Sequence, residues 1–207
     1  MARFPDNHRT GSVEQPLRCA VLISGSGTGM EALLKHQKAK KDCNHQTSLV
    51  ICNNPDAGGI QIAKNFDVPV QIFPLPSIED KVERRLYHEE QITKSLEEYD
   101  IELIILSGYM RLLSEKFVER WEMKIVNIHP SLLPEFPGAH AHQEVLSSGV
   151  KISGCSVHYV DAGMDTGQII AQKEVPVFPN DTVETLSQRV KVEEHILYPL
   201  VIDQLSS

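Results

Sequence analysis

The sequence is patterned as short, uninterrupted apolar runs that alternate with longer amphipathic segments. Residues 19–23, 49–52, 68–73 and 101–106 are such runs, and segments with helical spacing lie between them at about residues 30–38, 60–65 and 79–99. A strand that is apolar throughout is covered on both faces, as in parallel sheets whose strands are joined by right-handed helical crossovers. The pattern therefore predicts an α/β domain with a Rossmann-like, mostly parallel twisted sheet and helices on both faces.

The second half of the sequence continues this pattern and then departs from it. Residues 125–126 are predicted as a fifth strand, after a helix at residues 115–121 that Ser114 is expected to cap. Residues 156–160 and 169–177 are predicted as two further strands, and the short connection between them indicates an antiparallel pair. A final helix is expected to be capped by Asp181 and Glu184, and to kink or end at Pro199.

Length and composition narrow the class of protein. The 207 residues suit a single domain at residues 17–207, preceded by a flexible tail at residues 1–16 that has no periodicity. The net charge of −8 argues against a nucleic-acid partner, which needs clustered lysine and arginine. No apolar run approaches the roughly 18 residues of a membrane span, no signal peptide is recognisable, and the four cysteines are scattered. We therefore expect a cytoplasmic protein with reduced thiols and no membrane partner, as a monomer or homodimer.

A glycine-rich loop follows the first predicted strand. Gly25, Gly27 and Gly29 alternate with polar residues just before a predicted helix. Glycine lets the backbone approach a ligand closely, and the amides that open a helix favour an anion. The spacing is not that of the dinucleotide-binding fingerprint, so the loop predicts a site for a single phosphate group rather than for NAD, with an ordinary tight turn as the alternative.

The fifth predicted strand leads directly into a polar pair. Asn127 and His129 share strand parity, so both side chains can project to one side, and a proline-bounded segment at residues 130–134 follows them. An amide can stabilise a developing oxyanion and an imidazole can move a proton near neutral pH. A buried, hydrogen-bonded pair is the alternative, but the rigid flank favours a catalytic function.

Asp165 stands in an Asp-Thr-Gly triplet, which also occurs in aspartic proteases. Those enzymes need two carboxylates that share a proton, whereas this chain has one triplet in an α/β pattern. We expect instead a loop carboxylate beside His129, which raises the pKa of the imidazole or holds a water.

Three histidines raise the question of a metal site. His140 and His142 are two residues apart where a helix is predicted to begin, so their side chains diverge, and His158 follows on a strand. No third ligand stands at a convincing spacing, and no metal is expected.

Six segments of the chain form an ordered set. They are LISGSG at residues 22–27, LSGYMRLL at 106–113, NIHPSLLP at 127–134, SVHYV at 156–160, DTG at 165–167 and EH at 194–195. Together they resemble the phosphoribosylglycinamide formyltransferases, a folate-dependent family of purine biosynthesis, from about residue 18 to the end. The resemblance implies transfer of the formyl group of 10-formyltetrahydrofolate, as cosubstrate, to the amine of 5-phosphoribosylglycinamide, without a metal.

The resemblance also implies roles for individual residues. The N-terminal half would bind the substrate phosphate, and the C-terminal half would carry catalysis and folate binding. The implied catalytic residues are Asn127, His129 and Asp165. The implied substrate-binding residues are Gly27, Thr28 and Gly29 at the phosphate and Glu194 at the amine. The implied folate contacts are Arg85 (or its neighbour Arg84), Met110, Arg111, Leu112, Leu113, Asp161, Ala162, Gly163 and Met164.

The sequence departs from the family at two places, and other functions stay open. The family loop usually ends Gly-Ser-Asn where this chain has Gly27-Thr28-Gly29, and the chain stops at Ser207, short of a common C-terminal segment. Formyltetrahydrofolate hydrolases and methionyl-tRNA formyltransferases share a similar catalytic set but carry additional domains. A non-catalytic nucleotide-binding module would keep the loop but would not need Asn127, His129 and Asp165 together.

Overall fold

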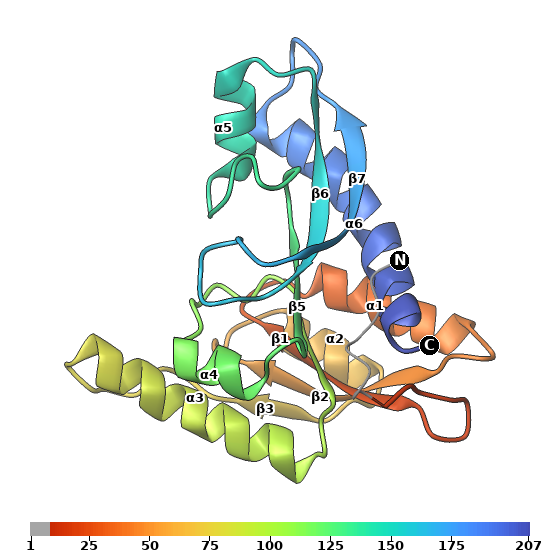
Figure 1. Cartoon of the computed structure of the whole chain (residues 1–207), viewed down its shortest axis with the longest axis vertical. Coiled ribbons are helices and arrows are strands. Elements are labelled where there is room, and N and C mark those ends of the chain that lie inside the picture. The colour runs from red at the N-terminus through yellow and green to blue at the C-terminus, as the bar shows by residue number, and fades with distance from the viewer. Residues whose placement is uncertain (1–8) are drawn as a thin grey trace.

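The computed structural model describes residues 9–207, which form one mixed seven-stranded sheet with helices packed around it (Figure 1). The strands are β1 (Leu17–Ile23), β2 (His45–Cys52), β3 (Val70–Ile72), β4 (Leu103–Leu106), β5 (Ile125–His129), β6 (Ile152–Tyr159) and β7 (Ile169–Pro176). The helices are α1 (Thr28–Ala39), α2 (Gly59–Asn65), α3 (Lys81–Glu98), α4 (Glu115–Arg120), α5 (Ala141–Ser148) and α6 (Val183–Leu205). Within residues 9–207, no helix is both long and apolar enough to cross a membrane.

The strand order is β3-β2-β1-β4-β5-β6-β7. The first five strands along this order run parallel, whereas β5, β6 and β7 are joined by antiparallel pairings. The predicted fold class is therefore confirmed, including the antiparallel pair near the C-terminus. After β1 the chain builds outward to β2 and β3, and then returns to place β4 on the other side of β1. In such sheets, ligands bind at this switch point, beyond the carboxyl ends of the strands.

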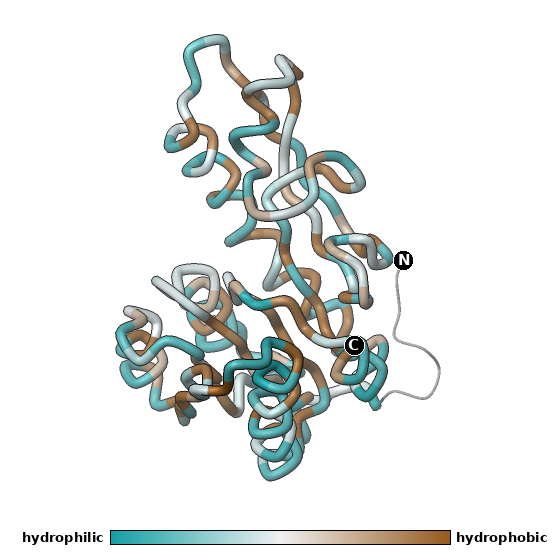
Figure 2. The backbone as a smooth tube through the Cα atoms, turned by 90° about the vertical axis from the view of Figure 1, so that its left-hand side faces the viewer, coloured by the Kyte–Doolittle hydropathy of each residue, from teal (hydrophilic) through white to brown (hydrophobic). Residues whose placement is uncertain are grey.

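Two apolar layers cover the parallel part of the sheet. One face packs against α1, α2 and the C-terminal part of α6, and the other packs against α3 and α4. A third cluster joins α5, β6, β7 and the first half of α6, and these elements extend away from the parallel strands in Figure 1. Figure 2 shows hydrophobic residues concentrated inside the molecule and hydrophilic residues along the outer turns. The Tyr198 hydroxyl hydrogen-bonds the carbonyls of Leu106 and Val126, which fastens α6 to β4 and β5.

The last helix differs from its prediction at both ends. Its N-cap is Thr182, in a reciprocal capping box with Thr185, because Asp181 is occupied by two hydrogen bonds from Arg189 at 2.8 Å. The helix does not end at Pro199 but continues to Leu205, whose side chain is buried in the core.

The predicted N-terminal tail falls partly outside the described residues, since residues 1–8 are not among them. Residues 9–16 contact the domain. Arg9 pairs with Glu102 at 2.6 Å, and the Gly11 N–H donates to the Ser206 carbonyl at 2.7 Å. These contacts hold the segment against the residue that precedes β4 and the C-terminal end of α6.

Candidate active site

Three loops meet at the switch point of the sheet. The Ser24 N–H donates to the Gly108 carbonyl (3.2 Å), and the Met110 N–H donates to Ser24 Oγ (2.9 Å), so the glycine-rich loop after β1 is tied to the corner after β4. Leu106, just before that corner, is paired with Asn127 in the β4–β5 register. The glycine-rich loop, the β4 corner and the end of β5 therefore share one rim.

The side chains of Asn127 and His129 lie on the same face of β5, opposite two side chains of β6. In the antiparallel register Asn127 faces His158 and His129 faces Ser156. His129 is only 4% exposed. Its Nε2 donates to the Phe136 carbonyl at 2.9 Å, and its Nδ1 lies 3.3 Å from Asp165 Oδ2. Both ring nitrogens of His129 therefore lie close to oxygen atoms, one of a backbone carbonyl and one of the Asp165 carboxylate.

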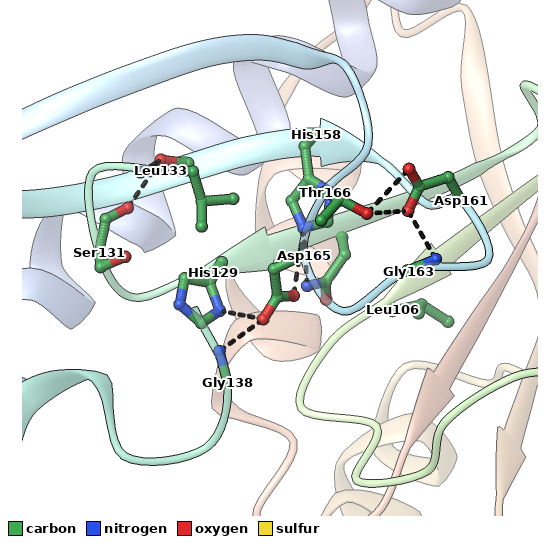
Figure 3. A network of polar contacts seen from close by, with 12 residues as sticks. Leu106, His129, Ser131, Leu133, Gly138, His158, Asp161, Gly163, Asp165 and Thr166 are labelled. Atoms are coloured by element: carbon green, nitrogen blue, oxygen red, sulfur yellow. Dashed lines mark hydrogen bonds and ion pairs between the residues drawn. The ribbon is translucent and has the colours of Figure 1, made fainter. Parts of the chain in front are cut away.

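Asp165 reaches the two histidines from the loop between β6 and β7. Figure 3 shows its carboxylate between the rings of His129 and His158 and above Gly138, whose N–H donates to Oδ2 at 2.8 Å. Oδ1 lies 3.6 Å from His158 Nε2. The contact with His158 lowers the pKa of Asp165, and the Gly138 N–H and the charge of His129 act in the same direction against the effect of burial. Asp165 is therefore held as a carboxylate.

His158 belongs to this arrangement; the sequence left open whether it lines the site or satisfies a hydrogen bond in the core. Its Nδ1 donates to the Tyr159 carbonyl at 2.8 Å, and its Nε2 lies 3.2 Å from the Asn127 amide nitrogen and 3.6 Å from Asp165 Oδ1. This contact holds the amide nitrogen of Asn127 beside β6 and next to Asp165. The only sequence signal was strand parity, since His158 shares a face with Ser156.

The proline-bounded segment after β5 is fixed by hydrogen bonds to β6 and β7. Ser156 Oγ accepts from the Leu133 N–H (2.9 Å) and donates to the Ser131 carbonyl (2.7 Å), and Gln172 donates to both Leu133 O and Ser156 Oγ. Ser131 Oγ donates to the Glu135 carbonyl at 2.6 Å. Both serine hydroxyls are thus engaged with the backbone, and neither is free to act as a nucleophile.

The glycine-rich loop forms the start of α1. Gly27 is the N-cap residue with φ 73°, and no side chain caps the helix, so the first N–H groups of α1 point to the rim without a side-chain acceptor. A Cβ on Gly27 would lie 2.6 Å from the Cα of Gly59, which explains the glycine. Thr28 and Gly29 contribute the first amides of the helix. An uncapped helix start of this kind favours an anion.

The residues assigned to folate by resemblance form an exposed apolar edge. Met110 is 72% exposed and Leu112 is 57% exposed, so these two side chains are not part of the core. Met164 is 52% exposed and lines a pocket of about 170 Å³ next to Asp165. The other walls of this pocket are Leu133, Pro134, Pro137, Thr166, Gly167 and Ile169. A larger groove of about 490 Å³ lies between α3 and α4 and contains none of the residues Asn127, His129 and Asp165.

The loop that carries Asp165 has its own internal bonds. Asp161 accepts from the Thr166 hydroxyl at 2.8 Å and from the Gly163 N–H at 3.1 Å, a network visible in Figure 3. Ala162 lies exposed between them, and Asp165 itself takes a left-handed backbone with φ 55°. The loop thus presents Asp165 at its inner end and Met164 at its outer surface.

Two residues assigned by resemblance, Arg85 and Glu194, come from helices rather than from the loops of the rim. Arg85 is exposed on α3, next to the half-buried Arg84, and Arg111 and Leu113 follow the β4 corner. Glu194 lies on α6, where burial raises the pKa of its carboxyl to about 7. Within residues 9–207, no hydrogen bond or ion pair joins Glu194 to Asn127, His129 or Asp165.

The three histidines considered for a metal do not form a group, but another set of side chains does. Among the described residues, His36, His45 and Asp203 have the spacing of metal ligands. Their hydrogen bonds argue against a metal. Gln37 Oε1 accepts from Thr47, so its amide nitrogen donates to His45 Nδ1 (2.9 Å), and His45 Nε2 must carry the proton that it donates to Asp203 (2.9 Å). Lys40 also lies 2.9 Å from this carboxylate. The cluster is therefore a hydrogen-bonded clamp between α1, β2 and α6.

Comparison with known proteins gives a consistent result. The sequence profile described as formyl transferase matches residues 17–202. The phosphoribosylglycinamide formyltransferase of Bacillus subtilis is 42% identical over 90% of this chain and 93% of its own length. The trifunctional purine biosynthetic protein adenosine-3 of Gallus gallus is 42% identical over 97% of this chain, which spans only 20% of that relative. The solved structure of glycinamide ribonucleotide transformylase 1 from Geobacillus kaustophilus superposes with a TM-score of 0.86 at 40% identity, covering 93% of this chain and 100% of that one.

Proposed function

This chain belongs to the formyl transferase family, and on that premise we propose that it transfers the formyl group of 10-formyltetrahydrofolate to the amine of phosphoribosylglycinamide. The observation that carries the proposal is the grouping of an amide, an imidazole and a carboxylate from β5 and the β6–β7 loop beside an anion-binding helix start. His129 and Asp165 are 3.3 Å apart, and Asn127 faces the same side of the sheet.

Substrate positioning follows from the two ends of the rim. The phosphate of phosphoribosylglycinamide binds the first amides of α1 at Gly27, Thr28 and Gly29, where the helix favours a negative charge. The folate lies along the exposed apolar edge at Met110 and Leu112, with Arg111 beside it, and against the 161–164 loop. The formyl carbon then lies between the two substrates, at the end of β5.

The reaction is a direct transfer. The amine nitrogen of the glycinamide attacks the formyl carbon, and the carbonyl oxygen takes the electron pair as an oxyanion. The amide of Asn127 and the positive charge of His129 stabilise this oxyanion, an effect worth roughly 3–4 kcal/mol for one preorganised donor. His158 keeps the Asn127 amide in the required orientation.

Asp165 completes the proton transfer. The amine loses a proton as the new C–N bond forms, and the folate nitrogen gains one as the old C–N bond breaks. Asp165 accepts the first proton and delivers the second, directly or through one water, which requires the ionised carboxylate that its lowered pKa maintains. No covalent enzyme intermediate is needed. Ser131 and Ser156 are bonded to the backbone, and burial raises the pKa of the Cys155 thiol to about 12.

The test is the absorbance change on deformylation of 10-formyltetrahydrofolate, measured with and without phosphoribosylglycinamide. We expect turnover only when the amine substrate is present. Equal turnover without it would identify a hydrolase, and no turnover in either case would favour a binding module. His129→Ala is the matched variant, and we expect it to lose turnover by about 10²–10⁴ while folate binding is largely kept.

A further inference from the structure

Ser107 follows β4 directly, and its hydroxyl makes no hydrogen bond to the described part of the chain. The residue as a whole is 9% exposed, but its unbonded Oγ is not among the side-chain atoms of residues 9–207 that are sealed from solvent. Its backbone N–H donates to the Leu22 carbonyl at 3.0 Å, so the main chain at this point is fixed to β1. Most polar groups of buried residues are hydrogen-bonded, so an unbonded hydroxyl that still reaches solvent is free to bind a ligand.

The hydroxyl of Ser107 points at the start of α1. A Cβ built on Gly29 would lie only 2.7 Å from Ser107 Oγ. Gly29 is not in a left-handed conformation, so its backbone alone does not demand glycine. The missing side chain instead leaves room for the Ser107 hydroxyl beside the first amides of the helix. The bonds between Ser24, Gly108 and Met110 hold the two segments in this relation.

We propose that Ser107 is a phosphate-binding residue whose hydroxyl donates a hydrogen bond to the substrate phosphate, which is held by the amides at the start of α1. The inference rests on the proposed function, since it assigns a side-chain donor to the same substrate. Both segments lie at the switch point of the sheet, where β1 and β4 are neighbours. A hydroxyl donor to a phosphate oxygen makes a charge-assisted bond, stronger than one between neutral groups. Gly29, which has no side chain, leaves the space that this hydroxyl occupies.

The first test is Ser107→Ala, which removes the donor without adding bulk. We expect the KM for phosphoribosylglycinamide to rise about tenfold, with kcat and the KM for the formyl folate unchanged. The dissociation constant of inorganic phosphate, measured by calorimetry, should rise in parallel. Ser153→Ala is the matched control, because Ser153 is also buried with an unbonded hydroxyl but lies at the opposite end of β6 from His158. An unchanged phosphate affinity in Ser107→Ala, equal to that of the control, would overturn the proposal.

The second test uses the contact with Gly29. Gly29→Ala places a methyl group against Ser107 Oγ, so it should displace the hydroxyl and weaken phosphate binding to a similar extent. Because both changes remove the same interaction, the double variant should bind phosphate about as weakly as Gly29→Ala alone. Additive losses would contradict the shared interaction. If the wild-type protein bound phosphate in a Ser107-dependent way but transferred no formyl group, the proposed function would fail while this binding assignment would stand.

Discussion

Replacing Asp165 by Asn tests the charge at the centre of the proposed chemistry. The amide has nearly the same shape and can still accept from the Gly138 N–H, so the change removes charge and basicity rather than structure. At 3.3 Å from His129 and an effective dielectric of about 20, the lost attraction is about 5 kcal/mol. General-base catalysis alone contributes a rate enhancement of about 10²–10⁴, which corresponds to roughly 3–5 kcal/mol of activation free energy. This energy does not exceed the lost attraction between the two side chains. We therefore expect kcat to fall by about 10²–10⁴.

The assay is steady-state deformylation with both substrates saturating, together with titration of the folate, whose affinity should change little. A double-mutant cycle with His129→Ala gives the sharper result. If the two residues act as a unit, the double variant should be no slower than the worse single variant. A variant that retained more than a tenth of the wild-type kcat, or losses that multiplied across the cycle, would refute the paired role.

Three further predictions concern stability. Burial raises the pKa of Glu194 to about 7, so between pH 4.5 and 7 the folded protein keeps a proton that the unfolded chain has lost. The free energy of unfolding should therefore fall as the pH rises through this range, by at most about 1.4 kcal/mol per pH unit. Urea titrations of Glu194→Gln should not show this slope. Asp203→Asn breaks the contacts with His36, Lys40 and His45, and should lower the free energy of unfolding by about 2 kcal/mol; a loss below about 0.5 kcal/mol in guanidinium titrations would contradict the clamp. Gly27→Ala combines a φ of 73° with a Cβ contact of 2.6 Å to Gly59, and should destabilise the protein by about 1–3 kcal/mol in thermal unfolding, whereas an unchanged midpoint would show that the loop relaxes freely.

Most of the fold could be predicted from the sequence because its dominant signal is burial. Strands covered on both faces must be apolar throughout, and this single property located β1, β4 and the buried half of β2. The first half of β2 was not predicted as a strand, because residues 45–48 are polar and the burial of His45 depends on its hydrogen bonds with Gln37 and Asp203. The N-cap of α6 was not predicted for a similar reason, because Asp181 accepts hydrogen bonds from Arg189, further along the chain, and Thr182 caps the helix instead.

The site was less predictable, because its parts lie far apart in the chain. Strand parity placed Asn127 and His129 on one face, but the partners of His158 depend on which residue β5 aligns with it. The free hydroxyl of Ser107 could not be recognised at all, because its significance depends on the distance to Gly29 across the β1–β4 junction. Local sequence patterns predict secondary structure, whereas these contacts form only after the sheet has assembled.

The most direct measurement follows the formyl carbon itself. The protein would be given 10-formyltetrahydrofolate labelled with ¹³C in the formyl group together with phosphoribosylglycinamide, and the products would be read by mass spectrometry and NMR. We expect the label on the amine nitrogen of the ribonucleotide, in proportion to the tetrahydrofolate formed, and lost in the Asp165→Asn and His129→Ala variants. Label released as formate, or a labelled ribonucleotide formed equally well by both variants, would contradict the account.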